Sequence, residues 1–134
     1  MQYLELKAKH EKELNEFPMM FAFNDKQFAE GLKKLGADKS EIAGTGGGGF
    51  IRKTDKEALK EMFNRHNNEM KEAMKNAEFA FNMFDYELCN HEYCITCDDY
   101  STISALGLTY DGIENNPILK EALKKAKLNT KWED

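Results

Sequence analysis

The chain has 134 residues, of which 32% are charged and 41% hydrophobic, and its formal net charge is -5. That length suits one domain with its own core, and the composition excludes general disorder. No apolar run approaches the roughly 20 residues that cross a bilayer. The first residues lack the apolar segment of a secretory signal, so we expect a cytoplasmic protein with no membrane association. Three cysteines are an odd number, which favours reduced thiols over a disulfide framework.

The spacing of apolar residues predicts five or six helices. They cover residues 3–16, 25–35, 55–75, 77–90, 100–106 and 117–128. Asn116 followed by Pro117 is a typical helix start, and Gly36 and Gly107 are typical helix stops. The helix that begins at Ala77 is apolar on nearly every side, which is typical of a buried helix.

Three short strands are predicted at residues 19–23, 50–53 and 93–96, and a turn at Asp111-Gly112. Helices packed around a buried central helix, with a small sheet, describe an α+β fold. We expect residues 1–134 to form a single compact domain in which the sheet packs on the buried helix. The tail from about residue 129 is expected to be loosely ordered, with Trp132 as a residue that could hold it.

Charge is distributed unevenly along the chain. No Lys or Arg occurs between Asn76 and Leu119, whereas that stretch contains eight carboxylates. A block of one sign attracts cationic partners or metal ions and repels nucleic acid. The alternative is that some of these carboxylates cap helices and the others are simply solvated. The candidate partner-binding residues are Asp85, Glu87, Glu92, Asp98 and Asp99.

Four consecutive glycines, Gly46, Gly47, Gly48 and Gly49, precede a predicted strand. Glycine-rich loops can direct backbone N–H groups at a phosphate. This one lacks the Lys-Ser/Thr of a P-loop and does not fit a dinucleotide-binding fingerprint. A surface hairpin is the favoured interpretation, and contact with an anion or ligand is the alternative.

A cluster at residues 86–99 contains the side-chain types that bind zinc. The weak metal candidates are Cys89, His91, Cys94 and Cys97. If residues 93–96 form a strand, Cys94 and Cys97 point to opposite faces. No second pair of ligands stands nearby in the sequence, and a redox CxxC requires a helix N-terminus. We therefore assign no metal, cofactor or catalytic residue.

The same cluster allows two other interpretations. Glu87, His91 and Glu92 could bind a divalent ion or share a proton. In the favoured interpretation, Asn90 ends the helix in a left-handed conformation, His91 and Glu92 tie the turn to neighbouring backbone, and Tyr93 packs. His10 and His66 lie on apolar helix faces, where a histidine is usually a packed residue.

The segments ELKAKH, EFPMMFAF, GGFIRKTD, MFDYELCNHEYCIT and ALGLT together resemble a family of short bacterial proteins associated with phages and conjugative elements. The similarity spans nearly the whole chain. It implies no established activity or cofactor. It does imply that cysteines are atypical at positions 89 and 97, which weakens the zinc interpretation. The family pattern points to Tyr86, Glu87, Asn90, His91, Glu92 and Tyr93.

The leading hypothesis is a non-enzymatic binding protein of a mobile genetic element that engages a basic surface of a protein partner. The resemblance suggests a host defence nuclease, such as a CRISPR effector, as that nucleic-acid-binding partner. The first alternative is a small-ligand or divalent-metal-binding protein, with or without hydrolytic activity, that uses Glu87, His91, Glu92 and the glycines. A second alternative is an accessory protein whose partner is its own copy. Direct DNA binding is not expected, because the lysines are dispersed.

Overall fold

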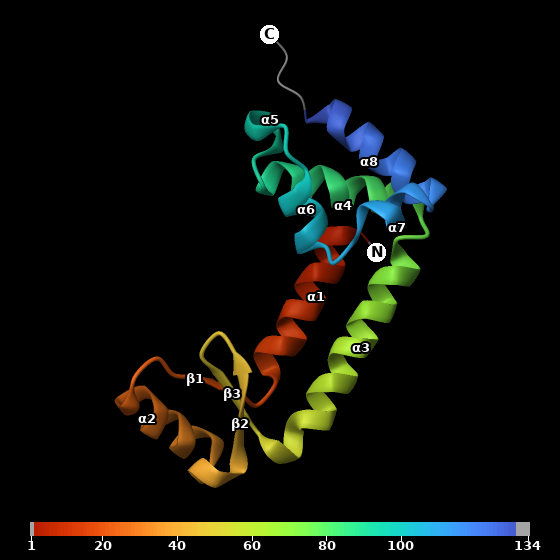
Figure 1. The fold of residues 1–134 in the computed structure, drawn as a ribbon. Coiled ribbons are helices and arrows are strands. Elements are labelled where there is room, and N and C mark those ends of the chain that lie inside the picture. Colours follow the sequence, from red (N-terminus) through yellow and green to blue (C-terminus); the bar gives the residue numbers. More distant parts are fainter. Residues whose placement is uncertain (1, 131–134) are drawn as a thin grey trace. The chain divides into compact units, whose positions relative to one another are not determined.

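A computed structural model describes residues 2–130, which are mostly helical with a three-stranded antiparallel sheet. This confirms the predicted α+β class. The helices are α1 (Tyr3–Glu16), α2 (Asp25–Leu35), α3 (Lys56–Ala73), α4 (Ala77–Asn90), α5 (Tyr93–Thr96), α6 (Tyr100–Ala105), α7 (Tyr110–Glu114) and α8 (Pro117–Asn129) (Figure 1). The strands are β1 (Met20–Phe21), β2 (Ile42–Gly46) and β3 (Gly49–Arg52), and short 3-10 turns cover Lys39–Glu41 and Lys53–Asp55.

The described residues form two compact units. The first, which we call the α4 unit, consists of residues 2–9 and 68–130, and the second, the sheet unit, consists of residues 10–67. Helices α1 and α3 each contribute residues to both. The expectation of a single domain stays a prediction.

Helix α4 is the centre of the α4 unit. Its apolar residues Met83, Phe84 and Leu88 are completely buried, as its sequence predicts. Helix α8 lies beside α4, and Figure 1 shows the two helices next to each other. Burial of each such side chain contributes about 1.5–3 kcal/mol. The other buried members of this core are Tyr3, Leu6, Phe79, Ala80, Ile103, Ile113, Leu119, Ala122, Leu123 and Ala126.

Asparagine side chains begin both helices of this core. The Asn76 side chain accepts a hydrogen bond from the backbone N–H of Phe79, and the Asn116 side chain accepts from those of Ile118 and Leu119. These bonds satisfy backbone donors that have no partner within the helix. The predicted helix starts at Ala77 and Pro117 are therefore confirmed.

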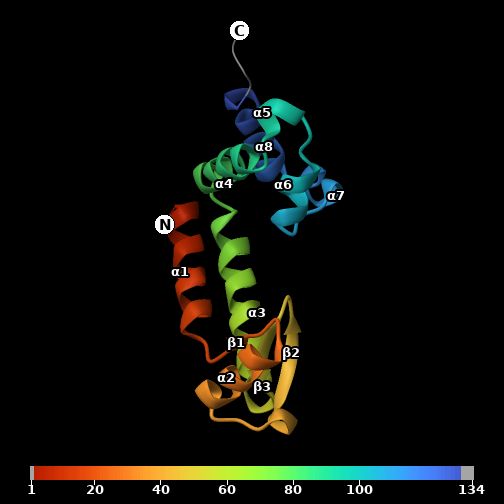
Figure 2. The same ribbon diagram turned by 90° about the vertical axis from the view of Figure 1, so that its left-hand side faces the viewer.

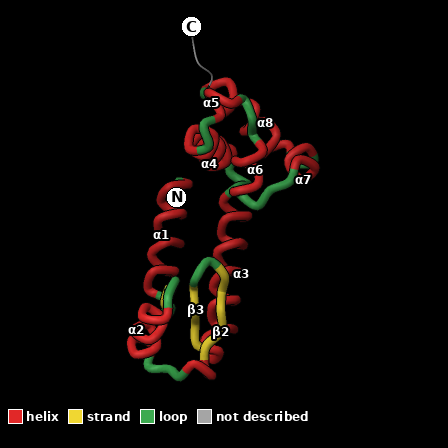
Figure 3. Tube along the Cα trace, turned by 60° about the vertical axis from the view of Figure 1, so that its left-hand side comes forward, coloured by secondary structure: helices red, strands yellow, loops and turns green. Residues whose placement is uncertain are grey.

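The sheet unit has the strand order β1-β3-β2, with both pairings antiparallel. Figures 2 and 3 show α2 beside the sheet and β2 and β3 as a hairpin. Helix α2 approaches β1 closely because Gly31 has no side chain: an added Cβ would lie 2.2 Å from the sulfur of Met20. The core of this unit is Ile51, Leu59 and Met62, against which Leu14, Phe17 and Met19 pack.

Three predictions of local structure are wrong. Residues 93–96 form a helical turn, and Asp111-Gly112 lies inside a short helix instead of a turn. The strand at residues 42–46 has no counterpart among the predicted strands. Its sequence, IAGTG, has only two β-branched residues, so pairing with β3 overrides a weak local preference.

The buried apolar residues form two clusters, one in each unit. The cluster around α4 contains no strand residue, and the sheet packs instead against residues of α1 and α3 within its own unit. No helix among residues 2–130 has both the length and the apolar character to span a membrane. Residues 131–134, which include Trp132, lie outside the described part of the chain, so the expectation for the tail stays a prediction.

Candidate functional site

The last two turns of α4 carry the residues to which the sequence pattern points. Tyr86 is partly exposed, Asn90 is exposed and His91 is half-buried. Glu87 differs from them, because its side chain is turned into the core and the residue is only 3% exposed. Removing a carboxylate from water is costly unless charged or hydrogen-bonding groups surround it.

Those groups come from α1 and from α4 itself. The Tyr3 hydroxyl donates to Glu87 Oε1 over 2.9 Å, and Lys7 Nζ donates to the same oxygen over 3.1 Å. His91 Nε2 lies 3.4 Å from Glu87 Oε2. Both carboxylate oxygens thus have partners within the protein, and the charge of Lys7 compensates that of Glu87.

Further contacts fix the surroundings of this carboxylate. Lys7 Nζ lies 5.3 Å from the centre of the Tyr86 ring and 5.9 Å from that of Tyr3, distances at which a cation is attracted to an aromatic face. The Thr102 hydroxyl donates to the backbone oxygen of Glu87 over 3.2 Å. Glu87 therefore joins α1, α4 and α6, and its position is that of a structural residue of the core.

The chain turns sharply after α4. Glu92, and not Asn90 as predicted, takes the left-handed conformation, with φ 59° and ψ 31°. Asn90 remains helical because α4 continues through it. Cys97 is left-handed as well, with φ 55°, so a residue of this rare conformation stands on each side of α5.

The acidic candidates divide into paired and exposed residues. Asp85 accepts a hydrogen bond from Asn129 over 2.8 Å, and Asp99 forms an ion pair of 2.6 Å with Lys127. Glu92 and Asp98 are exposed. Of the five acidic candidates, these two are the ones best placed to meet a partner.

Asp99 also accepts from the Tyr110 hydroxyl over 2.8 Å. Burial raises the pKa of Asp99, but the hydrogen bonds from Lys127 and Tyr110 outweigh it, so the pKa lies below its ordinary value. The same bond to Asp99 raises the pKa of Tyr110 to about 12. Asp99 is thereby committed to contacts within the protein.

Large apolar side chains accompany the two exposed carboxylates. Ile95 is 68% exposed and Tyr100 is 62% exposed. The segment is locally ordered, because the Thr96 hydroxyl accepts from the backbone N–H of Asp98, and the Asp98 side chain accepts from that of Tyr100. We call Glu92, Ile95, Asp98 and Tyr100 the α5–α6 surface. The sequence pattern predicted Glu92 and Asp98 as members of a binding surface. It did not indicate that Ile95 is exposed, because residues 93–96 were predicted to form a strand.

The three cysteines are free thiols, with Cys89 and Cys97 exposed and Cys94 half-buried. Burial raises the pKa of Cys89, and Asp85 and Cys94 raise it further. Among residues 2–130, no three His, Cys, Asp or Glu side chains converge as ligands of a metal ion would. The weak zinc set of Cys89, His91, Cys94 and Cys97 is therefore not assembled.

A sequence model described as "Family of unknown function (DUF7659)" matches residues 2–129. The chain belongs to this family. No curated protein and no solved structure matches the chain. The family match covers both units and includes every residue of the Glu87 cluster and of the α5–α6 surface.

The glycine run lies in the sheet unit. Gly46 pairs with Gly49, and the two residues between them, Gly47 and Gly48, have φ values of 59° and 82°. Positive φ at both central residues defines the type I′ turn that joins twisted antiparallel strands. The favoured hairpin interpretation is therefore confirmed. The Phe23 ring lies so close to Gly48 that an added Cβ would be 2.4 Å from it.

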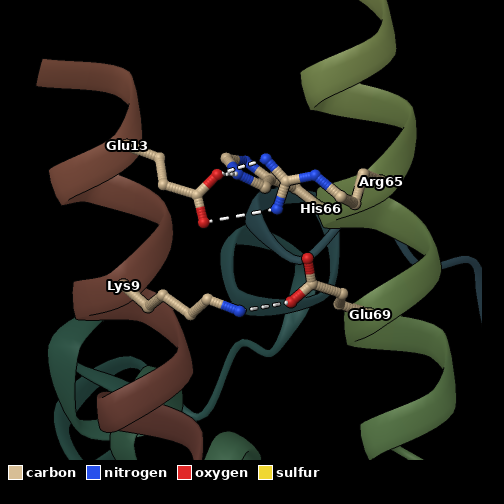
Figure 4. A network of polar contacts seen from close by, with 5 residues as sticks. All are labelled: Lys9, Glu13, Arg65, His66 and Glu69. Carbon is tan, nitrogen blue, oxygen red and sulfur yellow. Dashed lines mark hydrogen bonds and ion pairs between the residues drawn. The ribbon is translucent and has the colours of Figure 1, made fainter. Parts of the chain in front are cut away.

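Both predicted packed histidines also belong to the sheet unit. The rings of His10 and His66 stack, with centroids 3.9 Å apart and planes inclined by 15°. His66 Nε2 lies 3.1 Å from Glu13 Oε2, and Arg65 forms an ion pair with the same carboxylate (Figure 4). The hydrogen bonds from Arg65 and then His66 lower the pKa of Glu13 to about 2.

The sequence did not reveal this group because its two halves, His10 with Glu13 and Arg65 with His66, are more than 50 positions apart. Only the placement of His10 and His66 on apolar helix faces was visible. Figure 4 also shows the ion pair between Lys9 and Glu69 of the α4 unit, with 3.1 Å between Nζ and Oε2. Basic side chains pair with the carboxylates of Glu13 and Glu69, so we assign both carboxylates to contacts within the protein and not to ligand binding.

Proposed function

We propose that this protein is a non-enzymatic binding protein that engages a basic surface of another protein through its α5–α6 surface. The observation that carries the proposal is the joint exposure of Ile95 and Tyr100 beside the carboxylates of Glu92 and Asp98. Protein interfaces typically combine buried aromatic and aliphatic anchors with a charged rim. The anchors would supply affinity, and the carboxylates would supply orientation and rate of encounter.

The charge balance of the two units supports a basic partner. Residues 10–67 contain 10 basic and 10 acidic residues, so the sheet unit is formally neutral. The rest of the chain contains 9 basic and 14 acidic residues, and therefore carries the whole net charge of -5. Negative charge is thus concentrated in the unit that contains the exposed anchors.

The finer proposal is that the partner is a nucleic-acid-binding protein whose basic groove the α5–α6 surface occupies. Such grooves present Lys and Arg to phosphates and often contain stacking aromatic side chains. Carboxylates at Glu92 and Asp98 would replace the phosphates, and Tyr100 would stack. The resemblance to proteins of phages and conjugative elements adds the suggestion that the partner is a host defence nuclease.

The proposal is tested by affinity capture from bacterial lysate with the natural chain, the variant Glu92→Lys/Asp98→Lys and a matched control. The control, Glu5→Lys/Glu121→Lys, changes the net charge equally at two exposed residues of the same unit outside the surface. We expect the natural chain and the control to retain the same nucleic-acid-binding protein, and the variant to lose it. Retention should weaken as salt is added, because the rim charges are exposed to solvent.

A second variant, Ile95→Ser/Tyr100→Ser, separates anchoring from charge and should also lose the captured protein. Equal capture by all four chains would refute the α5–α6 surface as the binding surface. Recovery of only a second copy of the chain, with a concentration-dependent dimer in solution, would replace the proposal by self-association.

A further inference from the structure

The cysteines around α5 are not used by the proposed binding function. Cys89 lies in the last turn of α4, Cys94 lies within α5 and Cys97 immediately follows α5. In a strand, Cys94 and Cys97 would point to opposite faces. The structure has a helical turn instead of that strand, so Cys94 and Cys97 belong to the same turn of the backbone.

The turn is closed by backbone hydrogen bonds. The N–H of Cys97 donates to the oxygen of Tyr93 over 2.8 Å, and the N–H of Thr96 donates to that of Glu92 over 3.1 Å. In a closed turn the Cα atoms of residues three apart are less than about 7 Å from each other. A disulfide spans Cα atoms about 4.4–6.8 Å apart. The Cα atoms of Cys94 and Cys97 are therefore close enough for a disulfide to span them.

Cys97 lies immediately after α5, in a conformation that is rare for a residue with a side chain. Its φ of 55° and ψ of 22° are left-handed. The exposure of Cys97 also allows a reactant to reach its sulfur.

We propose that Cys94 and Cys97 form a reversible disulfide that closes α5, with a low-molecular-weight disulfide as oxidant. This is a bond that small thiols and disulfides open and close, and not a catalytic redox CxxC, which requires a helix N-terminus. This inference does not rest on the proposed binding function. Ile95 and Thr96 would lie within the resulting ring. The bond would therefore fix the most exposed apolar side chain of the turn.

The reaction proceeds by two thiol–disulfide exchanges. The Cys97 thiolate attacks one sulfur of the small disulfide, forms a mixed disulfide and releases the other half as a thiolate. Cys94 then loses its proton to solvent, attacks the sulfur of Cys97 and releases the second thiolate. Two electrons pass from the protein to the oxidant, and the two released thiolates take up the two protons lost by the cysteines.

Cys89 provides an internal control. It belongs to α4, and burial, Asp85 and Cys94 all raise the pKa of its thiol. A raised pKa leaves less of the reactive thiolate at neutral pH. Replacement of Cys89 should therefore leave the bond between Cys94 and Cys97 in place.

The test incubates the full chain with oxidised glutathione and maps disulfides by mass spectrometry after digestion. The natural chain and Cys89→Ser should lose two hydrogens and yield one peptide linked through Cys94 and Cys97. Cys94→Ser should instead stop at a glutathione adduct on Cys97. Failure to form the bond, a bond that involves Cys89, or only bonds between chains would refute the pairing.

A second measurement separates the folded turn from the general tendency of a CxxC sequence to close. The equilibrium between dithiol and disulfide is measured with the Cys89→Ser chain in glutathione mixtures, folded and in denaturant. Because α5 already orders Ile95 and Thr96, the disulfide should be favoured in the folded chain by roughly tenfold. If the equilibrium constant for disulfide formation is equal or smaller in the folded chain than in the denatured chain, α5 does not promote the bond.

Discussion

Glu87 shows how far the role of one residue depends on where its side chain lies. It belongs to an acidic stretch that favours an exposed surface, yet Tyr3 and Lys7 bind its carboxylate inside the protein. Asp99 is similar, since Lys127 and Tyr110 bind it. Charge in the sequence therefore overstates the acidic surface, and of the five acidic candidates only Glu92 and Asp98 are exposed.

The bond between Tyr110 and Asp99 gives a prediction at this scale. In the folded chain the pKa of Tyr110 is raised from 10.0 to about 12, because Asp99 accepts a hydrogen bond from the Tyr110 hydroxyl and disfavours the phenolate. The stabilisation is thus complete below pH 10 and is lost as pH rises through about 12. In Asp99→Asn we expect the pKa to fall toward its ordinary value, measured by NMR titration of the Tyr110 ring.

Asp98→Asn is the matched control for that titration. Asp98 acts on Tyr110 only through charge and more weakly than Asp99. The Asp98→Asn substitution should therefore shift the pKa of Tyr110 less than the Asp99→Asn substitution does. A shift in Asp98→Asn as large as that in Asp99→Asn would contradict the assignment to the hydrogen bond.

At the scale of elements, the hairpin between β2 and β3 depends on glycine for two separable reasons. Gly47 needs a positive φ but has open space beside it, whereas Gly48 needs a positive φ and also lies against the Phe23 ring. Gly47→Ala should cost about 1–2 kcal/mol of unfolding free energy, the usual penalty for a left-handed alanine. Gly48→Ala should cost more, and Gly47→Asn should cost less because asparagine tolerates this conformation. Urea unfolding measures all three.

Gly44→Ala is the control for the hairpin variants. Gly44 also lies in β2, but its φ is not positive and an added Cβ would make an ordinary contact of 3.8 Å with Phe50. Its unfolding free energy should stay close to that of the natural chain. A loss as large as that of Gly48→Ala would mean that β2 does not tolerate side chains in general, and that turn geometry is not the cause.

At the scale of the whole molecule, the two separate cores predict separate responses to cavities. Met83 is completely buried beside α8, and Ile51 is buried in the sheet unit. Truncation of either residue to alanine should lower the free energy of unfolding by about 2–5 kcal/mol. Hydrogen exchange should show that Met83→Ala lowers amide protection mainly in α4 and α8, and that Ile51→Ala does so mainly in β2 and β3. Equal loss throughout in both variants would instead indicate one cooperative core.

The local signals of the sequence determined much of this architecture. The apolar helix at residues 77–90 became the centre of a core, and Asn116, Gly36 and Gly107 mark helix ends as predicted. These features depend on nearest neighbours: a cap bonds to N–H groups within three residues, and a nearly uniform apolar helix must be buried.

Only the tertiary structure decided which polar residues face inward and which segments pair. Strand β2 forms because β3 pairs with it, although its own residues favour strand weakly. Residues 93–96 are β-prone yet helical, since left-handed Glu92 and Cys97 bound a closed turn between α4 and α6. The partners of Glu87 are about 80 positions away in sequence. No local pattern reports such distant contacts, because they arise when packing brings helices together and leaves each buried charge in need of a partner.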